Sequence, residues 1–501
     1  MLAIDIGTTR TKTALYDDKL RRGPTADVPT AGMDAEGTFD VAAIVDSVVQ
    51  LIVRETASRH LENTHAIGIT SFLSHIMYDA RGEVLGRGMS WAFQPAHEAI
   101  AACVAACSAA GYRPERPVGA ELLAPRLVHL ARYQPDRARR VARVISIKDV
   151  VRAALAGETP HDRIDLSSLV IDESFRDYSL MRDRNDRPIE PILELLRREG
   201  YEDPGSLLPR ALPPHHPAGY LARTPAARFH LPEGIPVATG ASDGTAAMYG
   251  GGVLVERRVV VVFGTTDVAM RVVPGGQGSD SGNEILSRNA AARPGYELIG
   301  GSTSASGSAL RWMQNMLVGA SRWDRVPRGA AGIRVAPGFA GERAPWNLPG
   351  RCGAIAGLTL NHSGAHIARA LAEAQTYRVR LLLERITRGE TNSLVVIGGG
   401  GNRTAELDAL RGEVLPWSLV WRRDAELSLC GAAIFASAAA VGDERARDAA
   451  LQELSRRAAG DIEVRSDPPA PRKESAETAA AYETFYREWL EWITNIYGEA
   501  E

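Results

Sequence analysis

The 501-residue sequence has little cysteine, little lysine and little net charge. Its four cysteines are too few and too scattered for a disulfide framework. A net charge of −3 gives no indication of a nucleic acid or an anionic membrane as a partner. Lysine occurs four times, so the other 54 of the 58 basic residues are arginine, a bias that we attribute to genome composition.

Long apolar runs are also missing. No stretch approaches the roughly twenty apolar residues that cross a bilayer, and the N-terminus enters a strand without a signal peptide. We therefore expect a cytoplasmic protein with no membrane and no nucleic acid as partner. The hydrophobic content of 45% is ordinary for a globular protein, and a chain of this length predicts two large domains.

Two short patterns imitate metal-ligand pairs. Cys103 and Cys107 lie one helical turn apart in an alanine-rich stretch, and His215 and His216 stand between prolines. No second ligand pair of suitable spacing accompanies the cysteines. We interpret the cysteines as small buried helix residues and the histidines as part of a loop.

The N-terminal sequence MLAIDIGTTRTKTALYD carries the most informative pattern. An apolar run ends at Gly7, Thr8 and Thr9 follow, and the chain then returns to apolar residues, which predicts a β-hairpin. Glycine allows close approach of a ligand, and the N–H groups and hydroxyls of such a turn can donate to phosphate oxygens. Arg10 and Lys12 add positive charge, so the turn suits a polyanion.

Asp5 lies inside the apolar strand just before this turn. A carboxylate there fits a metal ion, held directly or through water, although a surface hairpin with an exposed Asp fits this stretch equally well. A second copy favours the functional interpretation: RRVVVVFGTTDVAMRVV repeats the pattern with Gly264, Thr265 and Thr266. Two such hairpins half a chain apart indicate a duplicated architecture with one phosphate loop in each half.

Strand and helix patterns alternate in both halves, which predicts an α/β fold. Prolines are dense between residues 204 and 232, and we place a domain boundary just after them, giving domains 1–236 and 237–501. The tail at 476–497 has aromatic residues at helical spacing and predicts a packed terminal helix.

Asp243 follows a strand and a Gly-x-x turn, so its side chain is expected at the end of that strand. Phosphoryl transfer needs positioning, charge neutralisation and a carboxylate that accepts the proton of the acceptor hydroxyl. The alternative is that Asp243 caps the helix beginning near Thr245. The two phosphate hairpins favour the catalytic base. The glycine run 398–401 after a strand would let an adenine or ribose lie against backbone, although a bare turn would look similar.

An ordered series of motifs resembles the FGGY family of carbohydrate kinases over nearly the whole chain. The matching segments are DIGTTRTK at 5–12, ISIKDVVRAALAGE at 145–158, GASDG at 240–244, GTT at 264–266, GSALRW at 307–312, GERAP at 341–345, RCGAIAGL at 351–358, GGGGN at 398–402 and AELSLCGAAIFA at 425–436.

This resemblance implies two ribonuclease-H-like (actin-like ATPase) α/β domains with ATP and Mg²⁺ in an interdomain cleft. It implies Asp243 as catalytic base and Asp5 and Asp243 as metal-binding residues. It places the acceptor, a sugar or polyol, near His75, Trp91 and Asp243. The nucleotide-binding residues that it implies are Gly7, Thr8, Thr9, Arg10, Lys12, Gly264, Thr265, Thr266, Gly307, Gly399, Gly400 and Asn402.

Within the family, GASDG, GERAPW and GTTDVAMR are most similar to the gluconate-kinase branch. That branch usually carries a Trp-x-Asp-x-Arg stretch near the sugar, whereas Trp91 is followed by Ala-Phe-Gln-Pro. We therefore expect an ATP-dependent kinase with a gluconate-like acceptor favoured. The altered stretch suggests a changed acceptor as the alternative: one that is less hydroxylated or bulkier, a ketose or cyclitol, or another sugar acid bound by Arg126 or Arg271. The competing hypothesis is a regulator of the same fold that binds nucleotide and sugar without turnover. A homodimer is left open.

Overall fold

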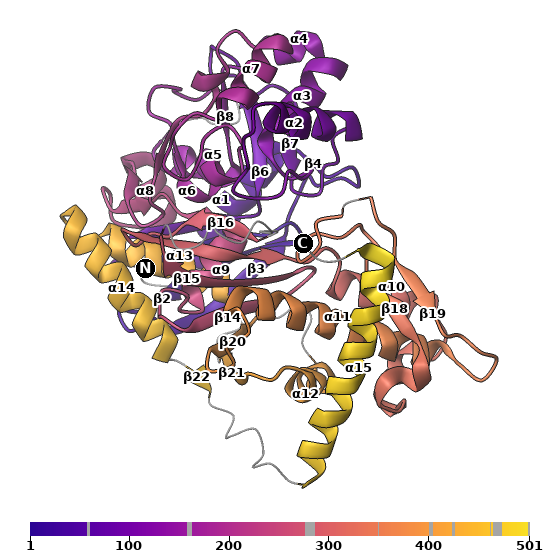
Figure 1. Ribbon diagram of the computed structural model, residues 1–501. Coiled ribbons are helices and arrows are strands. Elements are labelled where there is room, and N and C mark those ends of the chain that lie inside the picture. The colour runs from indigo at the N-terminus through magenta and orange to yellow at the C-terminus, as the bar shows by residue number, and fades with distance from the viewer. Residues whose placement is uncertain are drawn as a thin grey trace. The chain divides into compact units, whose positions relative to one another are not determined.

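The computed structural model, shown in Figure 1, divides into two compact units. It describes residues 1–57, 61–157, 163–275, 286–348, 350–399, 404–422, 426–460, 462–463 and 473–498. The first unit comprises Met1–Gly250, Asn289–Tyr296 and Leu427–Ala458, and the second comprises Gly251–Arg288, Glu297–Glu426 and Ala459–Glu501.

This division differs from the predicted boundary at residue 236. The first unit continues to Gly250 and also includes Leu427–Ala458, because the helices α9 (Asp243–Gly250) and α13 (Leu427–Ala439) pack against each other. Asp243, which we had assigned to the C-terminal domain, therefore belongs to the first unit. Local sequence patterns cannot show this division, because a segment from late in the chain returns to complete the first unit.

The first unit combines strands and helices in alternation. Its strands are β1 (Leu2–Ile6), β2 (Arg10–Tyr16), β3 (Arg22–Pro29), β4 (Thr38–Phe39), β5 (Ile67–Ser71), β6 (Ser74–Tyr78), β7 (Gly88–Ser90), β8 (Arg143–Ile145), β9 (Val170–Asp172), β10 (Arg210–Leu212), β11 (Pro217–Tyr220), β12 (Pro236–Ala238) and β13 (Ala241–Ser242). Its helices, besides α9 and α13, are α1 (Val41–Ala57), α2 (His97–Ala109), α3 (Leu123–Tyr133), α4 (Pro135–Ala138), α5 (Ile147–Leu155), α6 (Glu173–Asp177), α7 (Glu190–Arg198), the 3₁₀ helix η1 (Pro204–Leu207), α8 (Arg223–Phe229) and α14 (Glu444–Gly460).

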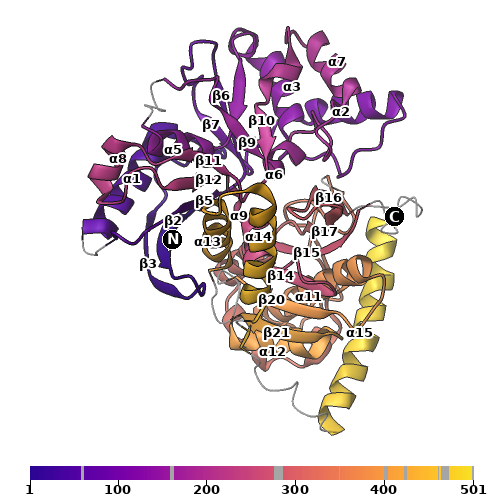
Figure 2. The same ribbon diagram turned by 90° about the vertical axis from the view of Figure 1, so that its left-hand side faces the viewer.

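The main sheet of the first unit has the strand order β11-β12-β5-β1-β2-β3, with β13 also pairing with β5. Figure 2 labels β11, β12, β5, β2 and β3 of this sheet. The predicted N-terminal hairpin is confirmed: β1 and β2 are antiparallel, with Asp5 opposite Lys12. On its other side β1 runs parallel to β5, with Asp5 opposite Thr70. The strand is buried on both faces, as an apolar run in the middle of a sheet requires.

The second unit repeats this hairpin arrangement. Its strands are β14 (Arg258–Phe263), β15 (Asp267–Pro274), β17 (Tyr296–Ser302), β18 (Arg334–Ala336), β19 (Ala354–Ala356), β20 (Leu394–Gly398), β21 (Ser418–Arg422) and β22 (Ile462–Glu463), with β16 (Ser287–Ala290) where the chain passes to the first unit. Its helices are α10 (Gly307–Met316), the 3₁₀ helices η2 (Ala320–Arg325) and η3 (Arg328–Gly332), α11 (Gly364–Thr387), α12 (Ala405–Val414) and α15 (Lys473–Tyr497).

The second predicted hairpin is also confirmed. β14 pairs antiparallel with β15 and parallel with β20, matching the pairing of β1 with β2 and β5 in the first unit. The C-terminal helix α15 is packed as predicted: Tyr482, Tyr486 and Trp489 are buried, and Trp489 lies 5.5 Å from Tyr377 of α11, measured between ring centroids. None of the described helices combines the length and apolar character needed to cross a bilayer.

Candidate active site

Asp5 lies in the centre of the first unit's sheet and is 7% exposed. Residues directly opposite on neighbouring strands project to the same face, so Lys12 of β2 shares a face with Asp5. The Oδ2 atom of Asp5 accepts a hydrogen bond of 2.6 Å from the hydroxyl of Ser428 on α13. The carboxylate is therefore held in one orientation by a residue from the far end of the chain.

Helix α13 reaches Asp5 because small residues let its backbone approach the sheet. A Cβ on Gly68 of β5 would overlap the carbonyl oxygen of Ala432, and a Cβ on Gly431 would overlap that of Ala246 on α9. Only glycine fits at both positions. These contacts fix α13 against β5 and α9, and so place Ser428 beside β1.

Asp243 is the first residue of α9 and follows strand β13, which pairs with β5 through Ala241 and Thr70. The hydroxyl of Thr70 donates to the carbonyl of Ala241 across 2.8 Å. Gly240 has a φ of +71°, and a Cβ there would overlap the carbonyl oxygen of Ile69. This glycine turn places Asp243 at the carboxyl end of β5, next to the strand that carries Asp5.

The two carboxylates act on each other. The pKa of Asp243 is raised to about 7, first by burial and then by the negative charge of Asp5. The backbone N–H of Gly244 donates to Asp243 Oδ1 across 2.7 Å and partly offsets this rise. This hydrogen bond joins neighbouring residues and is not the cap contact of the alternative interpretation, which would run to an N–H two or three residues further on. Two neighbouring carboxylates are a donor set suited to a hard divalent cation such as Mg²⁺.

A buried polar cluster supports the segment that carries Asp243. Lys148 Nζ lies 2.6 Å from Asp149 and 2.8 Å from Asp172, with all three side chains inaccessible to solvent. Ser174 donates its hydroxyl proton to Asp172 and accepts a 3.1 Å hydrogen bond from the backbone N–H of Ser242. This cluster fixes the residue immediately before Asp243. Lys148 and Asp149 lie in the matched segment 145–158, but the contact of Lys148 with Asp172, and through it with Ser174, joins two separate segments and is not part of any motif.

Hydrogen bonds hold the turn of the first hairpin. The N–H of Gly7 donates to the carbonyl of Arg10 across 3.1 Å, and a Cβ on Gly7 would lie only 2.7 Å from that oxygen. Thr30 donates to the Gly7 carbonyl through its hydroxyl at 2.6 Å and to the Thr9 carbonyl through its N–H at 3.0 Å. Thr9 is exposed and Thr8 partly so, whereas the Arg10 guanidinium forms an ion pair with Asp27.

The turn of the second hairpin is held in place by the start of α10. The N–H of Gly264 donates to the Thr266 carbonyl, and the N–H groups of Ser306 and Gly307 donate to the carbonyls of Thr265 and Gly264 at 2.9 and 3.1 Å. Gly307 therefore contacts the turn, as expected for a residue grouped with it. Two α11 side chains hold the preceding segment through its carbonyls: Gln375 donates to Ser306 and Arg378 to Ala305.

Gly399 follows β20 and has a φ of +87°. A Cβ there would overlap the carbonyl oxygen of Phe263, the last residue of β14, so Gly399 adjoins the strand that leads into the second hairpin turn. Gly400 and Asn402 lie outside the described residues, and their predicted role in nucleotide binding stays a prediction.

His75 and Arg126 form a buried pair in the first unit. His75 lies on β6 and Arg126 on α3; His75 Nδ1 is 3.0 Å from Arg126 Nη1. Because arginine can only donate, Nδ1 accepts and Nε2 carries the proton. Burial and then the Arg126 charge hold the pKa of His75 well below its ordinary value, so the ring is neutral at pH 7. Within the described chain, Nε2 has no hydrogen-bond partner.

Arg126 organises the stretch that departs from the family pattern. Its guanidinium donates to the carbonyls of Ala120, Trp91 and Phe93 at 2.9, 3.3 and 3.3 Å, and it is fully buried. Trp91 is partly buried beside it. The donors of Arg126 are thus directed at backbone rather than at a ligand carboxylate. Arg271, the other proposed carboxylate ligand, donates to the Ile386 carbonyl in the second unit.

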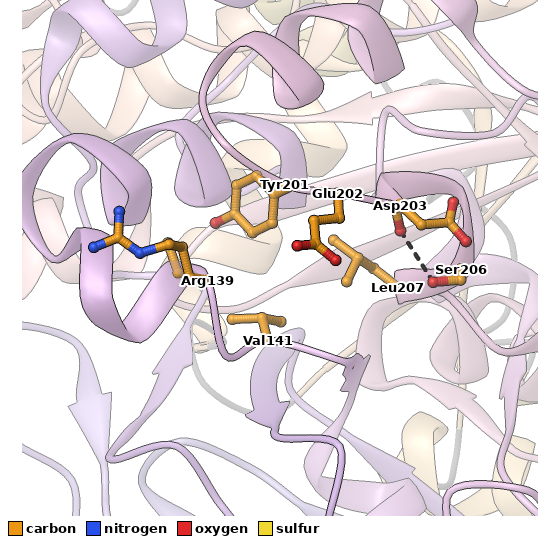
Figure 3. A pocket seen from close by; sticks show the side chains of 8 residues that line it. Arg139, Val141, Tyr201, Glu202, Asp203, Ser206 and Leu207 are labelled. Carbon is orange, nitrogen blue, oxygen red and sulfur yellow. Dashed lines mark hydrogen bonds between the residues drawn. The ribbon is translucent and has the colours of Figure 1, made fainter.

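A separate cavity of about 170 Å³ lies beside α4 and η1 (Figure 3). Polar side chains line much of it, among them Arg139, Glu202 and Asp203, and Ser206 donates to the backbone carbonyl of Asp203 there. None of the residues implied by the sequence motifs lines this cavity.

Two α/β units that each carry a Gly-Thr-Thr hairpin, one with an aspartate pair at the ends of its strands, define the class of actin-like sugar-kinase folds. The N-terminal domain of the FGGY family of carbohydrate kinases matches residues 1–250, and its C-terminal domain matches residues 259–440. The chain therefore belongs to the FGGY family of carbohydrate kinases, phosphotransferases with an alcohol group as acceptor.

Individual relatives are distant. A xylulose kinase from Staphylococcus xylosus is 23% identical over 322 residues, which cover 62% of this chain and 63% of that protein. A gluconokinase from Bacillus licheniformis is 25% identical over 443 residues, 80% of each chain. The gluconate-kinase branch is therefore not singled out.

Two solved structures with 18% and 16% sequence identity to this chain have the same fold. A ligand-bound xylulose kinase from Lactobacillus acidophilus has a TM-score of 0.81 at 18% identity and covers 100% of this chain and 99% of its own. A Plasmodium falciparum glycerol kinase with ADP has a TM-score of 0.75 at 16% identity, covering 98% of both chains.

Proposed function

We propose that the protein transfers the γ-phosphoryl group of ATP to a hydroxyl of a sugar, sugar acid or polyol, with Asp243 as general base. The observation that carries this proposal is the placement of Asp243 beside Asp5 at the carboxyl end of β5, with its pKa raised to about 7. A base of that pKa is half ionised at neutral pH and still accepts a proton well. Phosphoryl transfer asks little more of the protein than such a base and correct positioning.

Asp5 and Asp243 would hold Mg²⁺, and the bound ion would neutralise charge on the phosphates. The protein's own part is to keep the two carboxylates in place. Ser428 fixes the orientation of Asp5, and the cluster of Lys148, Asp172 and Ser174 fixes the backbone before Asp243.

The two hairpins are proposed to bind phosphate oxygens. In the first, Thr8 and Thr9 offer backbone N–H groups and hydroxyls, and Lys12 lies on the face of Asp5. Arg10 contributes through its charge while paired with Asp27. In the second, Gly264, Thr265 and Thr266 stand next to Gly307 at the start of α10. Gly399, Gly400 and Asn402 are proposed for the adenosine.

His75 is proposed to bind the acceptor through Nε2–H, and Trp91 to line the same site. A neutral donor suits a hydroxyl or carbonyl oxygen, and Arg126 already donates to backbone carbonyls. These observations favour a neutral ketose or polyol over the sugar acid that the motifs suggest. Gluconate remains a candidate acceptor because a gluconokinase is among the relatives.

The test is ATP turnover measured in a coupled assay over a panel that contains xylulose, gluconate, L-fuculose, glycerol and xylitol, each with Mg²⁺. The proposal expects at least one acceptor to give phosphate transfer well above the ATP hydrolysis seen without acceptor. The regulator hypothesis expects calorimetric binding of a sugar in the presence of nucleotide and no turnover with any acceptor.

A further inference from the structure

One cluster of three metal-ligating side chains occurs within the part of the chain that the structure describes, and the proposed reaction does not use it. His215 and His216 follow β10, and Asp448 lies on α14. One nitrogen of each histidine and one oxygen of Asp448 lie within 4.8 Å of one another. The two rings are perpendicular, with centroids 4.9 Å apart. By itself the histidine pair is interpreted as part of a loop, because its third partner lies more than 200 residues away in the sequence.

His215 is the buried member, with 1% of its surface exposed. Its Nε2 lies 2.8 Å from Asp448 Oδ1, and its Nδ1 is buried with no hydrogen-bond partner in the described residues. Burial lowers the pKa of His215 to about 4, and burial also lowers the pKa of His216. The neutral imidazole is the form that ligates a metal.

The charges around the cluster are balanced. Glu444 stands one helical turn before Asp448 on α14 and acts on His216, as do Arg447 and Arg210. The guanidinium of Arg447 donates to the carbonyls of Val441 and Gly442 at 2.8 and 3.0 Å, at the start of the helix. A water can complete the coordination shell of an ion held by the two histidines and Asp448.

We propose that His215, His216 and Asp448 form a binding site for a divalent transition metal of the Zn²⁺ type. Imidazole nitrogens select Zn²⁺, Co²⁺ or Ni²⁺ over Mg²⁺, which takes oxygen ligands. Tetrahedral zinc ligands stand roughly 3.4 Å apart, as bond lengths of about 2.0–2.1 Å require. Ligand atoms as far apart as 4.8 Å would have to close by up to roughly 1.4 Å, and His215 Nε2 and Asp448 Oδ1, now 2.8 Å apart, would have to separate slightly if both bind the ion. His216 and Asp448 are only partly buried, which gives the ion a way in.

The position of the site gives the metal a structural role. The carbonyl of His216 accepts from the N–H of Thr239 at 2.8 Å, and the carbonyl of Pro214 accepts from the N–H of Gly240 at 2.9 Å. The histidines therefore lie on the segment that pairs with the turn leading to Asp243. A bound metal would link this segment to α14 and stabilise the first unit.

The test uses the full-length protein, stripped of metal with a chelator and titrated with Co²⁺ and Zn²⁺. We expect one equivalent of Co²⁺ to give the intense visible absorption of a tetrahedral site, Zn²⁺ to displace it, and Zn²⁺ to raise Tm. His216→Asn and Asp448→Asn, which leave the buried His215 in place, should each weaken binding at least about 10-fold. Their metal-free Tm, measured alongside, separates lost ligation from lost folding.

Two controls distinguish this site from other metal-binding groups. The exposed pair His362 and His366, with ring centroids 5.3 Å apart, is removed in the double variant His362→Asn/His366→Asn, which should keep the Co²⁺ band. Asp243→Asn should also keep it. The proposal is overturned if the wild type shows neither band nor Tm rise, if the band survives in the His216→Asn/Asp448→Asn double variant, or if either control removes it.

Discussion

Ser428 donates its hydroxyl proton to Asp5 across 2.6 Å, although 423 residues separate the two along the chain. This hydrogen bond joins helix α13 to strand β1 inside the first unit. It connects Asp5, which is proposed to hold the metal, with a helix that the sequence analysis names only as a matching family segment, AELSLCGAAIFA at 425–436. Several consequences of this geometry can be measured.

Ser428→Ala should lower both stability and turnover. A hydrogen bond to a charged, buried acceptor contributes roughly 1.5–3 kcal/mol, and its loss leaves Asp5 free to change orientation. We expect a fall of about 2 kcal/mol in the free energy of unfolding by urea and a higher Mg²⁺ requirement. Ser428→Thr restores the hydroxyl and serves as the control; if it behaves like the alanine variant, the hydrogen bond is not the cause.

Gly431→Ala should separate α13 from α9, because the added Cβ would overlap the carbonyl oxygen of Ala246. Overpacking of this kind costs about 1–3 kcal/mol. Gly412 is a matched control in α12, where a Cβ meets nothing within 4 Å, so Gly412→Ala should be neutral or stabilise the helix. Thermal unfolding of both variants checks this, and equal Tm values for the two would contradict the close packing.

The Asp243→Asn variant should have a higher free energy of unfolding than the wild type at pH 8, but not at pH 4. The pKa of Asp243 in the folded protein, about 7, lies above its ordinary value of 3.8, so the folded state binds this proton more tightly. The wild type therefore loses stability as the pH rises towards 7. Asparagine cannot ionise, so the Asp243→Asn variant does not lose this contribution. Each pKa unit corresponds to about 1.4 kcal/mol, so we expect a gain of at least that size, measured by urea unfolding in EDTA.

A gain for Asp243→Asn of the same size at pH 4 and pH 8 would show that ionisation is not its origin. Mg²⁺ supplies an internal check. Bound between Asp5 and Asp243, it would favour the ionised carboxylate and reduce the advantage of asparagine.

His75→Gln should raise the KM for the acceptor and leave the KM for ATP unchanged. Glutamine keeps a donor, but it cannot reproduce both the contact with Arg126 and the position of Nε2–H. We expect about a 10-fold rise, and a smaller one than for His75→Ala. Steady-state kinetics with the best acceptor from the panel test this; an equal rise in both KM values would place His75 away from the acceptor.

The features of this protein that could be predicted are those that depend on short, continuous stretches of sequence. Both hairpins, the turn before Asp243 and the terminal helix α15 follow from local patterns of apolar residues, glycine and aromatic spacing. Ser428, the partners of Lys148 and the contact of His215 with Asp448 could not be predicted, because each depends on segments brought together by the fold. The division of the chain was missed for the same reason: α13 returns to the first unit.

Arg126 shows a further limit. Sequence alone suggested Arg126, together with Arg271, as a ligand for another sugar acid. Its guanidinium instead donates to the carbonyls of Trp91 and Phe93 in the stretch that lacks the family's usual charged pair. The packing around a charged side chain decides its role, and that packing is not visible in a motif.

The central claim is that Asp243 accepts the proton of the acceptor hydroxyl. Its most direct test is the turnover of Asp243→Asn with saturating ATP, Mg²⁺ and the best acceptor, with ATP affinity measured by calorimetry on the same preparation. We expect kcat to fall roughly 10²–10⁴-fold while ATP affinity is unchanged. Turnover within a few-fold of the wild type, with ATP still bound, would contradict the account.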